Sequence, residues 1–407
     1  MMIPYGYKQT EVGVIPEDWS VDTIGAVTLS VTNGGNYKNS AQISLYPLIK
    51  MGNISRGYIN LKKIEYVIGF PPSENDRLTY GDVLLNTRNT PELVGKVAIW
   101  KNELSRAYFN SNLLRFNFKL EKSDPFFMNL IFNTEQVISE FRNIAKGTTS
   151  VAAIYPQDML KVKIIIPPLQ EQQRIAEALS DVDGMISSLE KLIAKYKSIK
   201  TACLQQMFPQ NGETVPRMRL PGFTGAWEQR KLGDVVQITM GQSPDGSTYS
   251  DEPSDYILVQ GNADLQNGWV CPRIWTTQIT KKADAGDLIM SVRAPAGAMG
   301  KTAYNAVIGR GVAAIKGNEF IYQLLVKMDT DGFWKTLSCG STFESLNSDN
   351  IKNAEVKIPT TAEQIKIGGF FQYLDNLITL HQRKLEKIQK IKQGMMQQLL
   401  TGKIRLV

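Results

Sequence analysis

The chain has 407 residues, of which 43% are hydrophobic and 21% charged, so it is long enough for two or three globular domains. No apolar run approaches the roughly 18–20 residues that span a bilayer, and the N-terminus lacks the basic flank and apolar core of a signal peptide, so we expect a cytoplasmic protein. The cysteines number three and are widely spaced, and His381 is the only histidine, which argues against a disulfide framework, a metal site and most histidine-based catalysis.

The chain contains an internal repeat. Five short sequence blocks occur twice in the same order, and each second copy follows the first by between 192 and 208 residues. The paired blocks are residues 19–27 with 227–235, 81–88 with 286–293, 95–98 with 300–303, 147–149 with 340–342, and 167–175 with 359–367. Because chance similarity does not preserve order and spacing through five blocks, we expect two copies of one structural unit.

Each copy begins with segments typical of a mixed α/β globule. In the first copy, β-rich runs at 82–86, 94–100 and 113–118 alternate with Gly, Asn and Pro turns, and apolar residues at mostly helical spacing follow over 127–144. The second copy repeats this order with strands at 287–292 and 312–316 and a helix over 320–337. We therefore expect an α+β chain of two tandem, pseudo-symmetric α/β domains at residues 1–166 and 227–358, with a Gly-, Pro- and Asn-rich linker at 209–226.

A long helix is predicted after each globule, at 167–208 and, with a short tail, at 359–407. In both, mostly apolar residues recur at alternating spacings of four and three, which is the 3.5-residue period of a coiled coil. The main seam positions are Leu179, Val182, Ile186, Leu189, Ile193 and Lys200 in the first helix, and Phe371, Leu374, Ile378, His381, Leu385 and Lys392 in the second. A single helix packed on a globular core is the alternative, but its apolar stripe would drift off this period over such a length.

Polar residues in the seam indicate how the helices pair. Lys200 and Lys392 occupy equivalent positions of the repeat, and a lone polar seam residue commonly fixes register and orientation. Two matching helices joined by a linker pair most simply about a pseudo-twofold axis, so we expect an antiparallel coiled coil. His381 then lies near the centre of the seam, where we expect a packed histidine rather than a catalytic one.

The net charge of +7 is concentrated near the C-terminus, where seven basic residues between Arg383 and Arg405 face one acidic residue, Glu386. This favours a polyanionic partner, but a solvated helix face explains it equally well. Charge alone therefore does not establish nucleic-acid binding.

Taken together, the repeated blocks resemble the specificity (S) subunits of type I restriction–modification enzymes. The family's Trp-(x4)-Leu-Gly opening (with Ile24 in place of Leu in the first copy), Gly-Asp-hydrophobic strand, Gly-Ser/Thr-Thr turn and Pro-(x3)-Glu-Gln helix start each occur twice. The resemblance runs from Val14 to Ile404. The second copy departs modestly, with Thr360-Thr361-Ala362 where the first has Pro168-Leu169-Gln170.

This resemblance implies a non-catalytic scaffold that reads DNA. Each globule would be a target recognition domain for one half of a bipartite, asymmetric double-stranded sequence, and the helices would be spacers between the two. Two modification subunits, which bind S-adenosylmethionine and methylate adenine at N6, would dock on the helices, with restriction (translocase/nuclease) subunits as a further partner. No cofactor or metal is expected in this chain itself.

Direct readout of DNA requires side chains that reach base edges, so the candidates are polar residues in loops between strands. They are Asn33, Asn36, Lys38, Asn53, Arg56, Tyr58, Arg88, Asn89 and Lys96 in the first domain, and Gln242, Ser243, Gln260, Asn262, Lys282, Arg293 and Lys301 in the second. Residues that match in the repeat (Arg88 with Arg293, Lys96 with Lys301) are expected to contact phosphate. Residues that differ, such as Arg56 against Asn262, are expected to read bases, although each candidate can equally be an ordinary exposed loop residue.

Two other functions remain open at this point. A fused restriction or methylation enzyme would have to bind S-adenosylmethionine or a metal by itself, although the chain lacks an [DNS]-PP-[YFW] methylase motif and a phosphate-binding loop. A structural adaptor, whose basic C-terminal helix binds an acidic partner, would show no sequence preference on DNA.

Overall fold

The computed structural model describes residues 3–148, 150–210, 212–338 and 345–407. The chain divides into two compact units, the first made of Met1–Ser188 with Leu385–Val407 and the second of Leu189–Lys384. Each unit therefore contains one globule together with half of each long helix, rather than one uninterrupted stretch of sequence. The Gly-Ser/Thr-Thr block of the second copy lies outside the described residues, as does Thr149 of the first.

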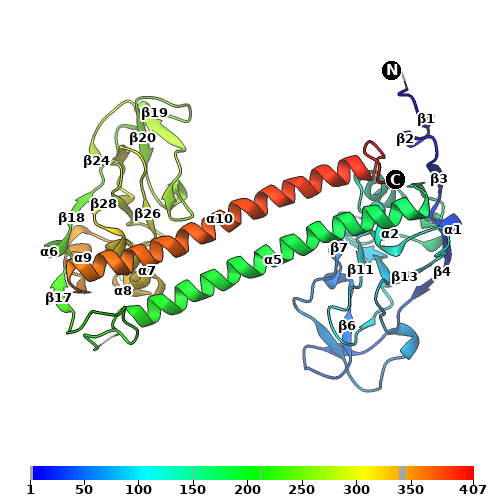
Figure 1. Cartoon of the computed structure of the whole chain (residues 1–407), viewed down its shortest axis with the longest axis horizontal. Coiled ribbons are helices and arrows are strands. Elements are labelled where there is room, and N and C mark those ends of the chain that lie inside the picture. The colour runs from blue at the N-terminus through cyan, green and yellow to red at the C-terminus, as the bar shows by residue number, and fades with distance from the viewer. Residues whose placement is uncertain (1–2, 149, 211, 339–344) are drawn as a thin grey trace. The chain divides into compact units, whose positions relative to one another are not determined.

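The first unit contains a five-stranded and a four-stranded sheet, with short helices beside them (Figure 1). The larger sheet has the order β4-β13-β9-β11-β7 and the smaller one β12-β6-β8-β5. The strands of these sheets are β4 (Thr28–Asn33), β5 (Asn39–Ser40), β6 (Pro47–Ile49), β7 (Gly57–Tyr58), β8 (Glu65–Val67), β9 (Val83–Asn86), β11 (Val97–Ile99), β12 (Tyr108–Phe109) and β13 (Leu113–Phe118). The smaller pairings are formed by β1 (Tyr7–Thr10) with β2 (Gly13–Pro16), β3 (Ser20–Thr23) with β16 (Lys163–Ile166), and β15 (Ala152–Ala153) with β10 (Arg88–Asn89) and β14 (Lys146–Gly147).

The helices of this globule are α1 (Ile24–Val27), α2 (Pro125–Phe132), α3 (Glu135–Ile144) and α4 (Pro156–Met159), with 3₁₀ turns η1 (Met51–Asn53) and η2 (Glu74–Asp76). The helical stretch predicted over 127–144 is thus two helices, because α2 ends at Phe132 and a new helix starts after Thr134. Asp124 caps α2 by accepting a hydrogen bond from the Phe127 amide, and Pro125 occupies the first turn, where its missing N–H costs nothing.

The second unit repeats this architecture with a six-stranded sheet, β18-β28-β25-β26-β22-β21, and a five-stranded sheet, β19-β23-β20-β27-β24. Its strands are β17 (Glu228–Lys231), β18 (Gln237–Met240), β19 (Tyr249–Ser250), β20 (Tyr256–Val259), β21 (Leu265–Gln266), β22 (Trp269–Val270), β23 (Ile274–Thr276), β24 (Lys281–Ala283), β25 (Leu288–Ser291), β26 (Met299–Lys301), β27 (Ala306–Ile308), β28 (Val312–Lys316) and β29 (Glu355–Ile358). The helices are α6 (Leu232–Val235), α7 (Glu319–Thr330), α8 (Phe333–Ser338) and α9 (Ser348–Lys352), and the 3₁₀ turns are η3 (Gly246–Thr248) and η4 (Asn262–Asp264).

Strand pairing corrects one block of the sequence repeat. On β11, Val97 pairs with Leu85, whereas on β26 it is Met299 that pairs with the equivalent Met290. Lys301 therefore occupies the place of Ile99, and the residue matching Lys96 is Ala298. The cause is a shorter loop after β25, because Gly297, which has a positive φ like Gly95, follows Arg293 by four residues instead of seven.

The two long helices, α5 (Leu169–Met207) and α10 (Thr361–Leu399), pair along the predicted seam (Figure 1). In the first unit Leu179 shares a buried cluster with Leu399, and in the second Cys203 and Met207 share one with Phe371. Burying a side chain of this size contributes roughly 1.5–3 kcal/mol. Because the start of each helix lies beside the end of the other within a unit, the pairing is antiparallel, as predicted.

The seam lysines form reciprocal ion pairs. Lys200 of α5 binds Asp375 of α10 at 2.6 Å in the second unit, and Lys392 of α10 binds Asp183 of α5 at 2.5 Å in the first. Asp183 and Asp375 are themselves equivalent positions of the repeat. His381 is half-buried and stacks on Tyr196, with ring centroids 5.6 Å apart and planes within 8°, which is the packed role that was predicted.

Candidate nucleic-acid interface

A polar depression of about 230 Å³ in the second unit gathers four of the predicted residues. Ser243, Gln260, Asn262 and Arg293 all line it, together with Arg310, which was not among the candidates. The lining comes from the turns that follow β18, β20, β25 and β27, so distant sequence segments converge at one place. Several polar side chains and backbone amides in one concave site form the kind of surface that can contact base edges or phosphates.

The backbone of this site is held by close packing and by a buried carboxylate. A Cβ at Gly241 would lie 2.1 Å from the Gly309 oxygen, so the turn after β18 accepts only glycine at that position. The Asp264 carboxylate accepts hydrogen bonds from the amides of Gln260 (2.7 Å) and Gly261 (3.2 Å), which fixes the turn that presents Gln260 and Asn262. Arg273 neutralises Asp264 at 3.0 Å.

The charge of the depression is positive. Arg293 follows β25 directly and is exposed, with its backbone oxygen accepting a hydrogen bond from the Ser291 hydroxyl at 2.9 Å. The Arg310 amide donates to the Ser243 oxygen at 3.1 Å, so the arginine is anchored by its backbone while its guanidinium is exposed. Among the described lining residues there is no Asp or Glu, and the site therefore favours an anionic or acceptor-rich ligand.

The other candidates of the second domain lie outside this depression. Gln242 is exposed beside it, and Lys282 is exposed on β24, with its Nζ 5.6 Å from the centre of the Tyr256 ring. Lys301 forms an ion pair with Glu319 at 2.9 Å and lies over the rings of Tyr322 and Trp269. A phosphate contact by Lys301 would have to break that ion pair, so we assign such contacts to other residues.

In the first domain the candidates are distributed over several loops. Asn36, Lys38, Tyr58 and Arg88 are exposed, while Asn89 and Lys96 are half-buried. Asn33 is exposed and donates to the Ser111 oxygen at 3.1 Å.

Asn53 does not present its side chain to a ligand. It is 4% exposed, accepts a hydrogen bond from the Lys50 amide at 3.0 Å and donates to the Asn60 oxygen, which makes it the counterpart of Asp264 in the repeat. The candidate role of Asn53 in base contact is therefore corrected to a structural one. Because Asn53 matches Asp264, the residue that matches Arg56 is Asn267 rather than Asn262.

Arg56 is a poorly satisfied cation of this domain. Burial and the nearby positive charge of Arg142 lower its pKa, and one of its Nη atoms is buried without a hydrogen-bond partner among the described residues. A guanidinium in this state gains more from an added acceptor than a fully hydrated one does. Sequence reasoning selected Arg56 only as a residue that differs in the repeat.

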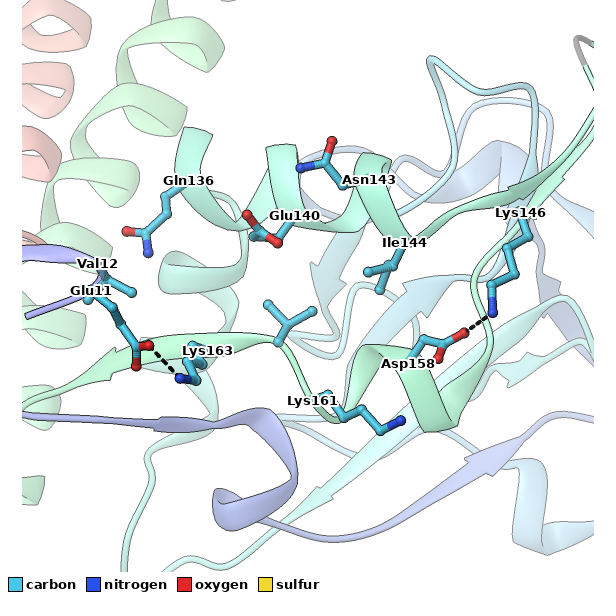
Figure 2. Close-up of a pocket in the computed structure, with 11 residues that line it drawn as sticks. Glu11, Val12, Gln136, Glu140, Asn143, Ile144, Lys146, Asp158, Lys161 and Lys163 are labelled. Carbon is cyan, nitrogen blue, oxygen red and sulfur yellow. Dashed lines mark hydrogen bonds and ion pairs between the residues drawn. The ribbon is translucent and has the colours of Figure 1, made fainter.

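A cavity of about 890 Å³ in the first unit is lined by other residues (Figure 2). Figure 2 shows Glu11 paired with Lys163 and Lys146 paired with Asp158, at 2.5 Å and 2.6 Å, on opposite sides of it. Its charged groups thus largely compensate one another, and no predicted residue lines it. No cluster of His, Cys, Asp and Glu that could hold a metal occurs among the residues that the structure describes.

The Pro-(x3)-Glu-Gln motif gains a physical role from the structure. Glu171 at the start of α5 is 2% exposed, and it accepts hydrogen bonds from the Trp19 indole (2.9 Å) and from Arg405 in the C-terminal tail (2.7 and 2.8 Å). Burial alone would raise the pKa of Glu171, but the bonds from Arg405 and Trp19 lower it overall. We call this ion pair the first clasp.

The second unit has an equivalent clasp. Glu363 at the start of α10 is 1% exposed and is bound by Arg219 of the linker through two contacts of 2.8 Å. In each unit, an arginine that follows one long helix thus binds the buried glutamate that begins the other. The adjacent Gln172 and Gln364 bond to the cap residues of α2 and α7, Asp124 and Asn318.

No helix among the described residues is long and apolar enough to span a membrane. The family model of the type I restriction modification DNA specificity domain matches the chain twice, at residues 16–199 and 225–390. The chain is 29% identical to the type I restriction enzyme MjaX specificity subunit of Methanocaldococcus jannaschii, over 98% of this chain and 97% of that protein, and 22% identical to the MjaVIII specificity subunit of the same organism, over 96% and 94%.

Two solved structures share the fold. A chain from a study of complex assembly and conformational transition of a type I R-M system has a TM-score of 0.55 at 23% identity, covering 96% of this chain and 99% of that chain. The S subunit of a type I restriction–modification system from M. genitalium has a TM-score of 0.65 at 15% identity, covering 94% and 96%. With two matched domains that span most of its length, the chain belongs to the type I restriction modification DNA specificity family and is a DNA specificity subunit, not itself a catalyst.

Proposed function

We propose that each unit of this specificity subunit reads one half of a bipartite, asymmetric DNA sequence. The observation that carries the proposal is the positive depression lined by Gln260, Asn262, Arg293 and Arg310. Arg pairs with guanine through two hydrogen bonds, and Asn or Gln pairs in the same way with adenine. The same scaffold in the first unit carries different side chains at its loops, so the two halves of the target differ in sequence.

Within this proposal, contacts fall into two classes. Exposed cations on strand ends, Arg88 and Lys282, together with Lys96, contact phosphate and position the DNA. Arg56, Arg310 and the amides of the depression contact base edges and carry the sequence preference. Asn33, Asn36, Lys38, Tyr58, Asn89, Gln242 and Ser243 remain candidates of either class.

We further propose that two modification subunits dock on the paired helices. Ile199 of α5 and Ile391 of α10 are equivalent positions, and both are exposed, at 36% and 47%. Tyr373 and Leu380 of α10, in the same unit as Ile199, are also exposed, at 62% and 60%. A repeated apolar position supports one copy of the same partner in each unit. Those subunits would supply S-adenosylmethionine and methylate adenine at N6.

A selection experiment tests the reading function. The chain, purified with its modification subunits, is incubated with duplexes that contain a fully randomised segment, and the bound molecules are sequenced. We expect enrichment of two short, unlike sequence elements at a fixed separation. Enrichment of a single continuous element, or of none, would contradict the proposal and favour the adaptor function.

A further inference from the structure

In the second unit, a chain of polar contacts runs from the helix seam into the recognition domain. Lys200 binds both oxygens of Asp375 at 2.6 and 2.9 Å, and Asp375 in turn accepts a hydrogen bond from the amide of Gln323 on α7 at 2.9 Å. The same amide donates to Glu319 at 2.9 Å, and Glu319 binds Lys301 at 2.9 Å. We call these five residues the polar chain.

The polar chain ends beside the candidate interface. Lys301 lies on β26 with its ammonium 5.0 Å from the centre of the Trp269 ring, and its backbone amide donates to the Gly268 oxygen. Trp269 is on β22, which pairs with β21. The β21 strand follows directly after the η4 turn that presents Asn262. Lys301 is therefore linked, through its backbone amide and the Trp269 ring, to the edge of the sheet from which the reading turn projects.

The centre of the polar chain is buried and has no alternative partners. Gln323 has no exposed surface, and its amide nitrogen uses both hydrogens, one on each carboxylate. The carbonyl oxygen of Gln323 has no partner among the described residues, so only the nitrogen holds α7 to α10 here. Burial and the charges of Asp375 and Glu319 together raise the pKa of Tyr322, which places both carboxylates near that one side chain. Two lysines balance the two carboxylates, and removal of either leaves a poorly solvated negative charge.

The first unit has the seam ion pair but not the rest of the polar chain. Lys392 binds Asp183, but the residue that matches Gln323 is Asn129, which donates to the Gly57 oxygen at 3.1 Å instead. Ile99 stands in the place of Lys301, and Pro125 in that of Glu319. The two seam lysines are therefore equivalent in the helix pair but differ in what lies behind them.

We propose that Gln323 is a positioning residue, which couples the helix seam at Lys200 to base discrimination by the second recognition domain alone. This inference rests on the proposed reading function. It predicts that changes at the seam alter one half-site of the target and leave the other unaffected. Coupling of this kind requires a demonstration that the residues act together, because spatial continuity by itself is not coupling.

The test compares Lys200→Met with Lys392→Met, each in the full chain bound to its modification subunits. Competition binding is measured with duplexes of the selected target that carry single base-pair changes in one half-site or the other. In the wild type, each change should reduce affinity by roughly 5- to 150-fold. We expect Lys200→Met to cut this factor to less than about one third in the half-site of the second unit only, and Lys392→Met to alter neither half-site.

A double substitution tests the path itself. Gln323→Met should reproduce the half-site effect of Lys200→Met, and the double variant should show no larger effect than the stronger single one, because both interrupt the same chain. If Gln323→Met does not fold, as judged by circular dichroism, Lys301→Met at the other end replaces it. Equal effects of Lys200→Met and Lys392→Met, or multiplied effects in the double variant, would overturn the coupling. Absence of discrimination in the wild type would instead refute the reading function.

Discussion

Removing the arginine of the first clasp should weaken the first unit specifically. Arg405→Met deletes two hydrogen bonds to Glu171, two to the exposed Asp18, and the only cation that binds Glu171 directly among the described residues. The Trp19 indole and the Leu406 amide still donate to the Glu171 carboxylate. Loss of one partner of a buried ion pair costs about 3–5 kcal/mol. Because the Arg405 side chain is 23% exposed and two donors to Glu171 remain, we expect a value near the lower end, about 3 kcal/mol.

The assay is thermal unfolding of the full chain together with amide hydrogen exchange. For a unit of about 200 residues, 3 kcal/mol corresponds to a fall of roughly 6–12 °C in its midpoint. Exchange should accelerate at the amides of β3 and β16, whereas Arg219→Met should accelerate exchange in the second unit instead. Arg217→Met is the matched control, because its partner Glu213 is an exposed i,i+4 pair at 3.2 Å, and a change of at most about 0.5 kcal/mol is expected. If Arg405→Met and Arg217→Met behaved alike, the clasp would contribute nothing to stability.

Three further predictions concern DNA, partners and pH. Arg310→Ala should relax base preference at one position by roughly 1–3 kcal/mol in competition binding. Lys96→Ala should instead weaken binding to all sequences and reduce the slope of log affinity against log salt concentration by about one. A uniform loss of affinity from Arg310→Ala would move that residue to the phosphate class. Ile199→Glu and Ile391→Glu should each remove one modification subunit, measured by native mass spectrometry, and retention of both subunits in either variant would exclude this surface. Since the pKa of Glu171 in the folded protein lies below its usual 4.5, the contribution of Glu171 to stability is complete above pH 4.5 and is lost as pH falls toward the folded-state pKa. Urea unfolding from pH 7 to 3 should therefore show a steeper loss of the free energy of unfolding in wild type than in Arg405→Met.

The helix seam was predictable because it depends only on the spacing of apolar residues within each helix. Alternating spacings of four and three place Leu179, Ile193 and Phe371 on one stripe, and burial of that stripe needs no knowledge of loops. The aspartates that pair with Lys200 and Lys392 follow from the same repeat, since Asp183 and Asp375 are equivalent. Antiparallel pairing brings each lysine to the aspartate of the opposite helix.

The clasps were not predictable in this way. The conserved spacing of the helix-start motif draws attention to Glu171 and Glu363, but their partners follow the ends of α10 and α5 by six and twelve residues, respectively. Neither arginine lies in one of the five repeated blocks, so comparison of the two copies does not align Arg405 with Arg219. Only the chain's return to the start of the opposite helix brings them together.

The grouping of candidate residues in one depression was predictable only in part. Gln260, Asn262 and Arg293 were chosen because polar loop residues can reach bases, and strand order then placed them in one depression. Lys301 was misaligned because a short Gly-Lys block recurs three residues out of register. A side chain in the place of Ile99 faces the rings of the buried Tyr322 and the exposed Trp269. Arg310 was missed because it lies between two glycines in a short turn, and Ser243, the residue that its backbone amide binds, is 67 residues away in the sequence.

The central claim is that each unit reads its own half of the target. The most direct measurement replaces Val21–Asp158 with the matching segment of a relative, expresses the chimera with the modification subunits, and maps methylated adenines across the host genome. The account predicts that one sequence element of the bipartite site changes to that of the relative while the other element stays the same. A simultaneous change of both elements would contradict it.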